Sequence, residues 1–250
     1  MKNIDEWIPS KFVYHRGRLT ASRNTKEAGL PSRLIIEIVA EYYDTYIKQF
    51  ATGRLIDLGC GKVPLFEVYR DHVDEVICVD WENTLHQNRF VDFECDLNEH
   101  IPFLDGEFDT IILSDVLEHI QKPDQLWAEM ARILRIDGHI IMNVPFYYRI
   151  HEAPFDFYRY TEFALRRFAE SNGFRVEVLN PIGGSPEILA DILAKSIYNI
   201  PVFGKFLAMA IQGLTLLFIR TKLGSSISRS TSYAFPLGYF MVAKRIIQPG

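Results

Sequence analysis

Short apolar runs alternate with longer amphipathic stretches between about residue 50 and residue 180. Each run has the length of a strand and is followed by turn residues and then by a pattern of helical period. Strands that alternate with helices are typical of an α/β protein with a parallel sheet, whose buried strands are apolar on both faces. We expect seven strands, near residues 54–58, 76–80, 90–95, 108–114, 138–144, 174–179 and 238–244.

Two helices beside these strands have clear boundaries in the pattern. The segment 32–50 carries apolar residues at intervals of three and four, and it begins with a serine that follows a proline. Thr161 can cap a second helix over residues 162–172, which ends before a glycine. Residues 1–30 are polar, and we expect an irregular segment. Its candidate anchors on the core are Trp7, Phe12 and Tyr14.

More than fifty residues separate the last two strands, from about residue 180 to residue 236. That is too long for a structureless loop, so we expect an inserted helical subdomain. Residues 186–199 are amphipathic, residues 206–219 are apolar almost all round, and the serine-rich residues 225–232 read as a flexible loop. The apolar helix is shorter than the roughly 20 residues that span a bilayer. It is therefore a buried helix or dimer contact, or it lies on a membrane or grips a lipid-like substrate.

The most informative motif follows the first strand, where Asp57-Leu58-Gly59-Cys60-Gly61 turns the chain. Glycines have no Cβ, so the backbone can bend tightly there and approach a ligand closely. Open α/β sheets bind ligands at the carboxyl ends of their strands. The spacing is Gly-x-Gly-x-x-Pro, which lacks the third glycine of the dinucleotide fingerprint. The motif indicates either a nucleotide-type cofactor or only a tight turn between a strand and a helix.

Acidic residues also end the next two strands. Asp80 lies about 20 residues after the glycine turn, the offset of a carboxylate that binds ribose hydroxyls. The neighbouring Trp81 offers an aromatic face, and Asp96 ends the third strand. Because the carboxyl ends of parallel strands share one edge of the sheet, these side chains should line one crevice. These acids favour a nucleotide-type cofactor over a turn that only connects a strand to a helix.

Several segments of the chain resemble those of a known family. The segments LIDLGCG, VD, FDTIILSDVLEHI and ARILRIDGHIIMNVPF are similar to those of class I S-adenosylmethionine-dependent methyltransferases, in particular the methyltransferase type 11-like family. The resemblance covers about residues 50–180. It implies S-adenosylmethionine as cofactor and a Rossmann-like, mostly parallel seven-stranded sheet with helices on both faces and an antiparallel last strand. The cofactor-binding residues that it implies are Asp57, Gly59, Cys60, Gly61, Asp80, Trp81, Asp96, Leu97 and Ser114.

The resemblance also implies which part of the cofactor each position meets. Asp57 and the two glycines would line the methionine end, and Asp80 would hold the ribose hydroxyls. Trp81 and the residues of the third strand end would meet the adenine, whereas Ser114 would lie beside the sulfonium. The sequence departs from many relatives at residues 62–64, where they carry another glycine. This departure concerns the details of the loop.

The loop 145–161 after the fifth strand is dense in His, Glu, Asp, Arg and Tyr. It should hang over the strand-end crevice, where an acceptor hydroxyl needs a base near its proton. His151 is the first candidate base, because histidine titrates near neutrality. His119 and Asp156 are further catalytic candidates. The alternative is that His151 and Asp156 only brace the loop.

Other residues of this region leave two readings open. Arg159 either binds an anionic group of the substrate or pairs with Asp156. A metal site made of Glu118, His119, His151 and Glu152 would lack a ligand-spacing signature, so we predict no metal.

The loop also resembles a His-Glu-x-Pro-x-Asp-x-x-Arg-Tyr-Thr pattern in a subgroup of these methyltransferases. Members of that subgroup often occur among enzymes of surface-glycan or lipid modification, which points to such an acceptor by analogy.

Composition indicates which class of partner and which cellular compartment to expect. The formal net charge of −5 argues against a nucleic-acid backbone as the main partner, since phosphate binding needs clustered Lys and Arg. The three cysteines show no metal-ligand spacing and read as small residues in a reducing compartment. The N-terminus lacks the apolar core of a secretory signal. We therefore expect a cytoplasmic protein, with peripheral membrane contact and a homodimer as options for the insertion.

These observations predict an N-terminal segment and helix (1–50) that pack on a methyltransferase domain (51–250), with the insertion at about 180–236. We expect methyl transfer to a small-molecule, glycan or lipid-linked acceptor, at oxygen. The alternatives are a catalytically silent methyltransferase-like partner, a nicotinamide-dependent oxidoreductase and a membrane-surface adaptor. Acids at three strand ends argue against the silent protein. The missing third glycine argues against the oxidoreductase.

Overall fold

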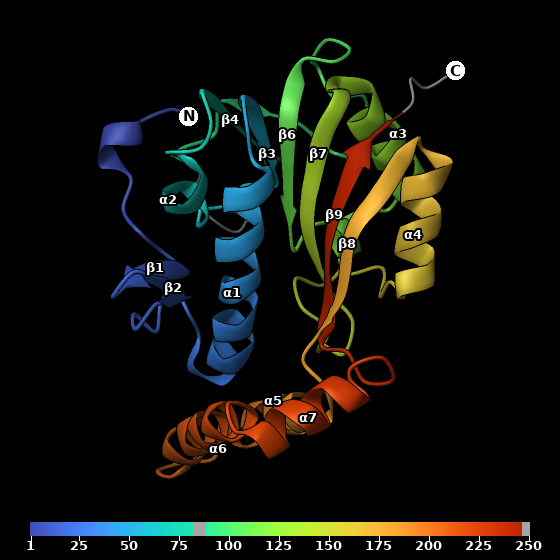
Figure 1. Cartoon of the computed structure of the whole chain (residues 1–250). Coiled ribbons are helices and arrows are strands. Elements are labelled where there is room, and N and C mark those ends of the chain that lie inside the picture. The colour runs from blue at the N-terminus through green and yellow to red at the C-terminus, as the bar shows by residue number, and fades with distance from the viewer. Residues whose placement is uncertain (83–88, 247–250) are drawn as a thin grey trace.

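The central sheet of the computed structural model, which describes residues 1–82 and 89–246, contains seven strands (Figure 1). They are β3 (Arg54–Leu58), β4 (Glu75–Asp80), β5 (Phe93–Glu94), β6 (Phe108–Ser114), β7 (Leu134–Pro145), β8 (Phe174–Ile182) and β9 (Gly238–Arg245). Their order is β5-β4-β3-β6-β7-β9-β8, and only β9 is antiparallel to its neighbours. The predicted Rossmann-like sheet with an antiparallel last strand is confirmed.

Helices cover both faces of this sheet because successive strand residues point to opposite sides. Ile56 and Leu58 of β3 face the core beneath α3 (Pro123–Ile133) and α4 (Glu162–Ser171). Leu55 faces the opposite core, beneath α1 (Arg33–Phe50) and α2 (Phe66–Tyr69). The Thr161 hydroxyl accepts a hydrogen bond from the Ala164 amide and caps α4, as the sequence predicts. Each face therefore has its own apolar core.

The N-terminal segment is more regular than its polar composition predicts. After a short 3-10 turn (Ile4–Glu6), β1 (Phe12–His15) and β2 (Arg18–Ala21) form an antiparallel hairpin. Arg16 and Gly17 have φ values of 51° and 76° at its turn, where a two-residue hairpin loop favours positive φ. Phe12 is buried in the core beneath α1, and Trp7 packs edge-on against Phe66. The expectation of an irregular segment was wrong because only the alternate residues of a hairpin need be apolar.

Two elements near the cofactor motif are shorter than the sequence predicts. The third strand was expected over 90–95, but β5 contains only Phe93–Glu94 at the edge of the sheet. An edge strand has one neighbour only, and Phe93 is exposed, so little fixes its length. The chain after β3 makes turns before α2, which has only four residues. The glycine turn therefore leads into a loop and not directly into a long helix.

Three helices join β8 to β9, namely α5 (Ser185–Ile197), α6 (Gly204–Ile219) and α7 (Lys222–Thr231). Residues 225–232 were expected to be a flexible loop, and this prediction was wrong because most of them form α7. The Thr221 hydroxyl caps this helix by accepting a hydrogen bond from the Gly224 amide. The Thr231 hydroxyl accepts one from the Ser185 amide. Contacts between helices thus stabilise a serine-rich stretch of low helix propensity.

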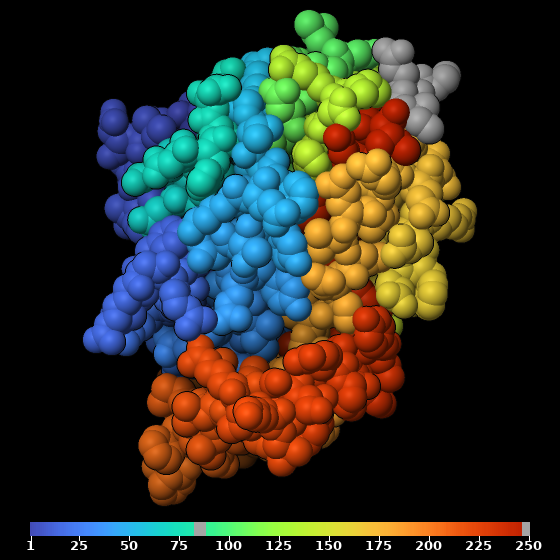
Figure 2. All heavy atoms as spheres, in the orientation of Figure 1, coloured from blue at the N-terminus to red at the C-terminus, as the bar shows by residue number. Residues whose placement is uncertain are grey.

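The layer formed by α5, α6 and α7 lies at the carboxyl ends of the parallel strands (Figure 1). In the space-filling view it projects from the body of the molecule (Figure 2). Within the described residues no single helix is long and apolar enough to cross a membrane. The helices α6 and α7 pass that test only when they are taken as a pair, and this pair is bent by 96°.

Candidate functional site

The glycine turn after β3 is held against β4 by backbone hydrogen bonds. The amides of Gly59 and Cys60 donate to the Val79 carbonyl at 2.8 and 3.1 Å, and the Gly61 amide donates to Oδ2 of Asp80 at 2.8 Å. Gly59 has a φ of 70°, and a Cβ at this position would lie 2.5 Å from a Val116 methyl group. Glycine is therefore required there. The backbone of residues 59–61, which we call the cradle, is held against β4, and Val116 packs closely on it at Gly59.

Two carboxylates flank this cradle. Asp57 is buried and accepts a hydrogen bond from the Tyr69 hydroxyl at 3.0 Å. Burial raises the pKa of Asp57 to about 7, and the nearby charge of Asp80 raises it further, whereas the Tyr69 hydrogen bond lowers it. Asp80 is buried at the end of β4 and also accepts the Trp81 amide. A cationic ligand in this crevice would relieve the repulsion between the two carboxylates.

The positions expected to meet the adenine lie next in the chain. The Trp81 ring packs edge-on against Phe155 of the loop 145–161, with 5.1 Å between the ring centroids. Oδ1 of Asp96 accepts hydrogen bonds from the amide and the side chain of Asn98, and Leu97 is buried. The Cys60 side chain is also buried in the core, so only its backbone faces the turn. The loop 145–161 therefore reaches Trp81, one of the expected cofactor-binding residues.

The end of β6 is contacted by residues that the sequence did not single out. The Tyr43 hydroxyl donates to Oγ of Ser114 at 2.5 Å. The next residue, Asp115, has a φ of 54° and binds Lys11 Nζ at 2.8 Å and the side-chain amide of Asn143. No sequence signal links Lys11 to Asp115, because 104 positions separate them. The N-terminal segment thus supplies a cation to the strand-end edge.

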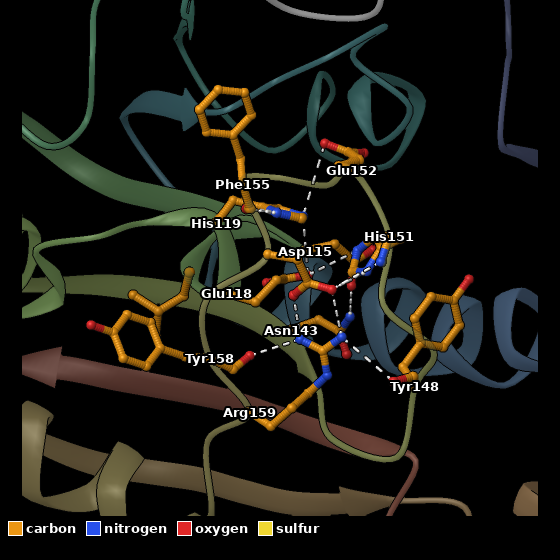
Figure 3. A network of polar contacts seen from close by, with 12 residues as sticks. Asp115, Glu118, His119, Asn143, Tyr148, His151, Glu152, Phe155, Tyr158 and Arg159 are labelled. Carbon is orange, nitrogen blue, oxygen red and sulfur yellow. Dashed lines mark hydrogen bonds and ion pairs between the residues drawn. The ribbon is translucent and has the colours of Figure 1, made fainter.

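His119 and His151 meet at a buried carboxylate (Figure 3). Oε1 of Glu118, whose side chain has no exposed surface, lies 3.7 Å from Nε2 of His119 and 3.7 Å from Nε2 of His151. The two imidazole rings pack edge-on with 4.7 Å between their centroids. Burial raises the pKa of Glu118. Burial lowers the pKa of His151, but Glu118 and Asp156 raise it more, so that it lies above its ordinary 6.5.

Asp156 holds the loop in shape. Its carboxylate accepts hydrogen bonds from the His151 amide at 2.9 Å and from the Arg159 guanidinium at 2.5 and 2.8 Å. The same guanidinium donates to the Arg149 carbonyl at 3.2 Å. These bonds from Arg159 lower the pKa of Asp156. The sequence left two roles open for Arg159, and the structure shows the pairing with Asp156.

A cavity of about 190 Å³ opens beside the histidine pair. Its polar wall contains Asp115, Glu118, Asn143 and His151, and its apolar wall contains residues of α1 and of both ends of the insertion. Tyr148 lies on this wall, and its hydroxyl is 3.2 Å from the Ser32 hydroxyl, which does not cap α1 as expected. The lining residues are Lys11, Ser32, Ile35, Ile36, Val39, Asp115, Glu118, Asn143, Val144, Pro145, Tyr148, His151, Glu152, Ile182, Leu237 and Gly238.

The histidine pair also has the donor set of a metal site. Ligand atoms of Glu118, His119 and His151 all lie within 4.8 Å of one another. Nδ1 of His119 lies 2.6 Å from the Phe155 carbonyl, which leaves Nε2 directed at Glu118. The sequence analysis named these residues together but predicted no metal, because they lack a ligand-spacing signature and His151 lies more than 30 positions from His119. These three side chains are the described residues that could hold a metal ion.

Comparison with known proteins supports a methyltransferase. Residues 56–142 match the family model of a methyltransferase domain, whereas no curated protein matches the sequence. A chain in the complex of the Haloferax volcanii Trm112 methyltransferase activator with a methyltransferase is 17% identical, at a TM-score of 0.56. The match covers 84% of this chain and 90% of that one.

Two further solved structures share the fold. A SAM-dependent methyltransferase from Archaeoglobus fulgidus is 19% identical over 86% of this chain and 93% of that one, with a TM-score of 0.53. A geranyl diphosphate methyltransferase in complex with SAM is 14% identical over 90% and 93%, with a TM-score of 0.54. Residues 56–142 therefore form a methyltransferase domain, and the chain shares its fold with S-adenosylmethionine-dependent methyltransferases.

Proposed function

We propose that this enzyme methylates a hydroxyl oxygen of a small-molecule, glycan or lipid-linked acceptor, with His151 as the base. The observation that carries the proposal is a half-buried imidazole on the wall of a cavity, close to two carboxylates. Glu118 and Asp156 would stabilise the imidazolium that forms when His151 takes the proton of the acceptor. The resulting base is positioned for an acceptor that the cavity holds.

The residues around the glycine turn fit the proposed cofactor half of the site. A tight backbone cradle and two carboxylates suit a ligand that carries positive charge at its methionine end. When it is bound, the cofactor supplies an activated methyl group on a sulfonium. We propose that Asp57, the turn at residues 59–61, Asp80, Trp81, Asp96, Leu97 and Ser114 bind it.

In the proposed step, the acceptor oxygen forms a bond to the methyl carbon while the bond from that carbon to sulfur breaks. The electron pair of the broken bond stays on sulfur, and the hydroxyl proton passes to His151. The protein mainly aligns the two reactants, which can contribute several kcal/mol of barrier reduction. We assign His119 and Asp156 to positioning, because His119 contacts Glu118 and Asp156 holds the loop.

The dimensions of the cavity support an acceptor of which only one part enters. Its volume of about 190 Å³ is smaller than the roughly 300–1,000 Å³ of pockets that enclose whole drug-sized ligands. The polar wall suits a hydroxylated group, and the apolar wall suits a hydrocarbon chain or the face of a ring. We propose a cytoplasmic location as well, which the free thiols of Cys60, Cys78 and Cys95 support.

The proposal is tested by incubating the enzyme with S-adenosylmethionine and a panel of sugars, lipid-linked glycans and simple alcohols. Formation of S-adenosylhomocysteine and of a methylated product is followed by mass spectrometry. We expect turnover with a hydroxyl acceptor and a loss of about 100- to 10,000-fold in His151→Gln, whose cofactor affinity should be unchanged. Methylation of nitrogen or carbon only would contradict the proposal. Cofactor binding without turnover on any acceptor would favour the catalytically silent partner instead.

A further inference from the structure

The layer of α5, α6 and α7 buries its acidic side chains and exposes many of its large apolar ones. Its acidic and amide side chains point inward and are buried. Glu187 of α5 accepts hydrogen bonds from the Gly184 amide and the Ser228 hydroxyl. Asp191 pairs with Lys195 at 2.7 Å, and Gln212 of α6 accepts the Leu34 amide at 2.8 Å. These buried polar groups hold the layer together and fix it to α1.

Large apolar side chains take the outward positions. In α5, Leu189 is 68% exposed, although it belongs to the apolar stripe of the helix. The turn into α6 and the first part of that helix expose Val202, Phe203 and Phe206 by 87%, 71% and 69%. Leu217, three turns further along α6, is 64% exposed. More than half of the exposed large apolar residues in the described chain lie between residues 189 and 235. An apolar surface of this extent indicates a partner.

The charges around this surface identify the chemistry of the partner. Residues 185–237 contain five Lys or Arg residues and two acidic residues, a net charge of +3, whereas the whole chain carries −5. Both acidic residues are buried, and the cations Lys205, Lys222 and Arg229 are exposed. The exposed charges of the layer are therefore all positive. Apolar side chains beside exposed cations are typical of segments that lie on a membrane with anionic lipids.

We propose that α5, α6 and α7 dock this enzyme on the surface of an anionic bilayer, with the turn around Val202 and Phe203 inserted among the lipid head groups. The 16 residues of α6 extend about 24 Å, which is less than the roughly 30 Å of a hydrocarbon core. The helix therefore lies along the interface and does not cross it. A symmetric pairing of two copies through this surface would bring cations together without an exposed acidic residue from the layer to balance them.

Docking would place the acceptor cavity next to the lipid. The Nζ atom of Lys195 lies 3.6 Å from the centre of the Tyr148 ring, and Tyr148 lines the cavity. Ile182 and Leu237, at the two ends of the insertion, form part of the apolar cavity wall. A chain-linked acceptor could thus remain in the membrane while its polar group enters the cavity. The docking itself does not depend on the proposed methyl transfer.

The test is flotation of the intact protein with vesicles of phosphatidylcholine, with and without 30% phosphatidylglycerol. We expect flotation with the anionic vesicles, and less of it as salt rises from about 0.1 to 0.5 M. Substitution of Val202, Phe203 and Phe206 by serine should abolish it. Lys205→Glu with Lys222→Glu should weaken binding by at least about fivefold per residue.

Matched variants control for composition and charge. Leu104→Ser with Ile136→Ser changes exposed apolar residues at the amino ends of β6 and β7. Arg70→Glu with Arg175→Glu repeats the charge change at two exposed arginines, one at the end of α2 and one in β8. Neither pair should alter flotation. Calorimetric affinity for S-adenosylmethionine should be unchanged in every variant, which shows that each one is folded.

Two results would overturn the docking proposal. One is that wild-type protein does not float with anionic vesicles while it binds the cofactor normally, which leaves the methyltransferase itself intact. The other is that native mass spectrometry finds a stable dimer of the wild-type protein and only a monomer of the serine variant. That dimer would show that a second copy covers the apolar surface.

Discussion

The Nε2 atom of His151 lies 3.7 Å from Oε1 of Glu118, a carboxylate with no exposed surface. The histidine comes from the loop after β7, and the glutamate lies in the 3-10 turn (Leu117–His119) after β6. The loop is fixed to that turn by the Phe157 amide, which donates to the Glu118 carbonyl at 2.9 Å. One residue thus connects the loop backbone and the imidazole to the end of the sheet.

Glu118→Gln should lower the pKa of His151, because loss of the negative charge removes a cause that raises it. The imidazole resonances followed by NMR against pH measure this shift, and the distant His72 is an internal control. A pKa of His151 that does not change would show that the two side chains do not interact in solution.

The proposed role of His151 as the base also predicts how the rate of methyl transfer depends on pH. A base accepts a proton only when it is neutral, so the rate should rise with pH through the raised pKa of His151 and level off above it. In Glu118→Gln the rise should move to lower pH. Initial rates from pH 5 to 9 measure both profiles. A wild-type rate that falls with rising pH over this range would exclude His151 as the base.

Cofactor binding should release a proton from Asp57. This carboxyl has a pKa of about 7 in the free protein, and a positively charged ligand favours its ionised form. The affinity should therefore rise as pH increases to about 7 and change little above it. Calorimetry at pH 6.5 in phosphate and in Tris measures the release, which should vanish in Asp57→Asn. Equal binding enthalpies in the two buffers would show that Asp57 is ionised before binding.

Asp80→Asn should weaken cofactor binding by roughly 10- to 100-fold, the cost of losing hydrogen bonds to a charged group. The amide keeps the size of the carboxylate but removes its charge from the ribose position. Asp92→Asn is the matched control, because the Asp92 carboxylate also accepts a backbone hydrogen bond, from the Cys78 amide at 2.8 Å. Circular dichroism checks the fold of both variants. Equal affinities of the two variants would contradict the ribose assignment.

Asp156→Asn should reduce the free energy of unfolding by about 2 kcal/mol at pH 7, because a charged hydrogen-bond acceptor of Arg159 is lost. The lowered pKa of Asp156 means that its stabilisation is present above the unfolded value near 3.9 and is lost as pH falls below it. The difference between wild type and variant in urea unfolding should therefore shrink between pH 5 and pH 3.

Asp105→Asn is the control for this comparison, since Asp105 also pairs with an arginine but is 82% exposed. Its effect should stay below about 1 kcal/mol, as for surface ion pairs. An Asp156 variant that is as stable as wild type at pH 7 would show that Arg159 does not hold the loop.

The placement of the residues that we propose to bind the cofactor was predictable from local sequence. Asp57, Gly59 and Asp80 stand at strand ends, and parallel strands bring their carboxyl ends to one edge of the sheet whatever lies between them. The order of apolar runs and glycine turns therefore determined both the fold and the position of the crevice. The lengths of the edge strand and of the short helix after the turn were not determined, because few neighbours fix them.

Other features depended on the packing of distant segments. Lys11 reaches Asp115 only because the hairpin packs against α1, and His151 reaches Glu118 only because the loop folds back on the sheet. The spacing of residues along the chain does not reveal such contacts. The helical period of residues 186–219 predicted apolar faces, but a period cannot show whether neighbours cover a face. The sequence by itself determined the succession of strands and helices and the acids at the strand ends, whereas only the tertiary structure decided what lines the cavity and which apolar surface faces outward.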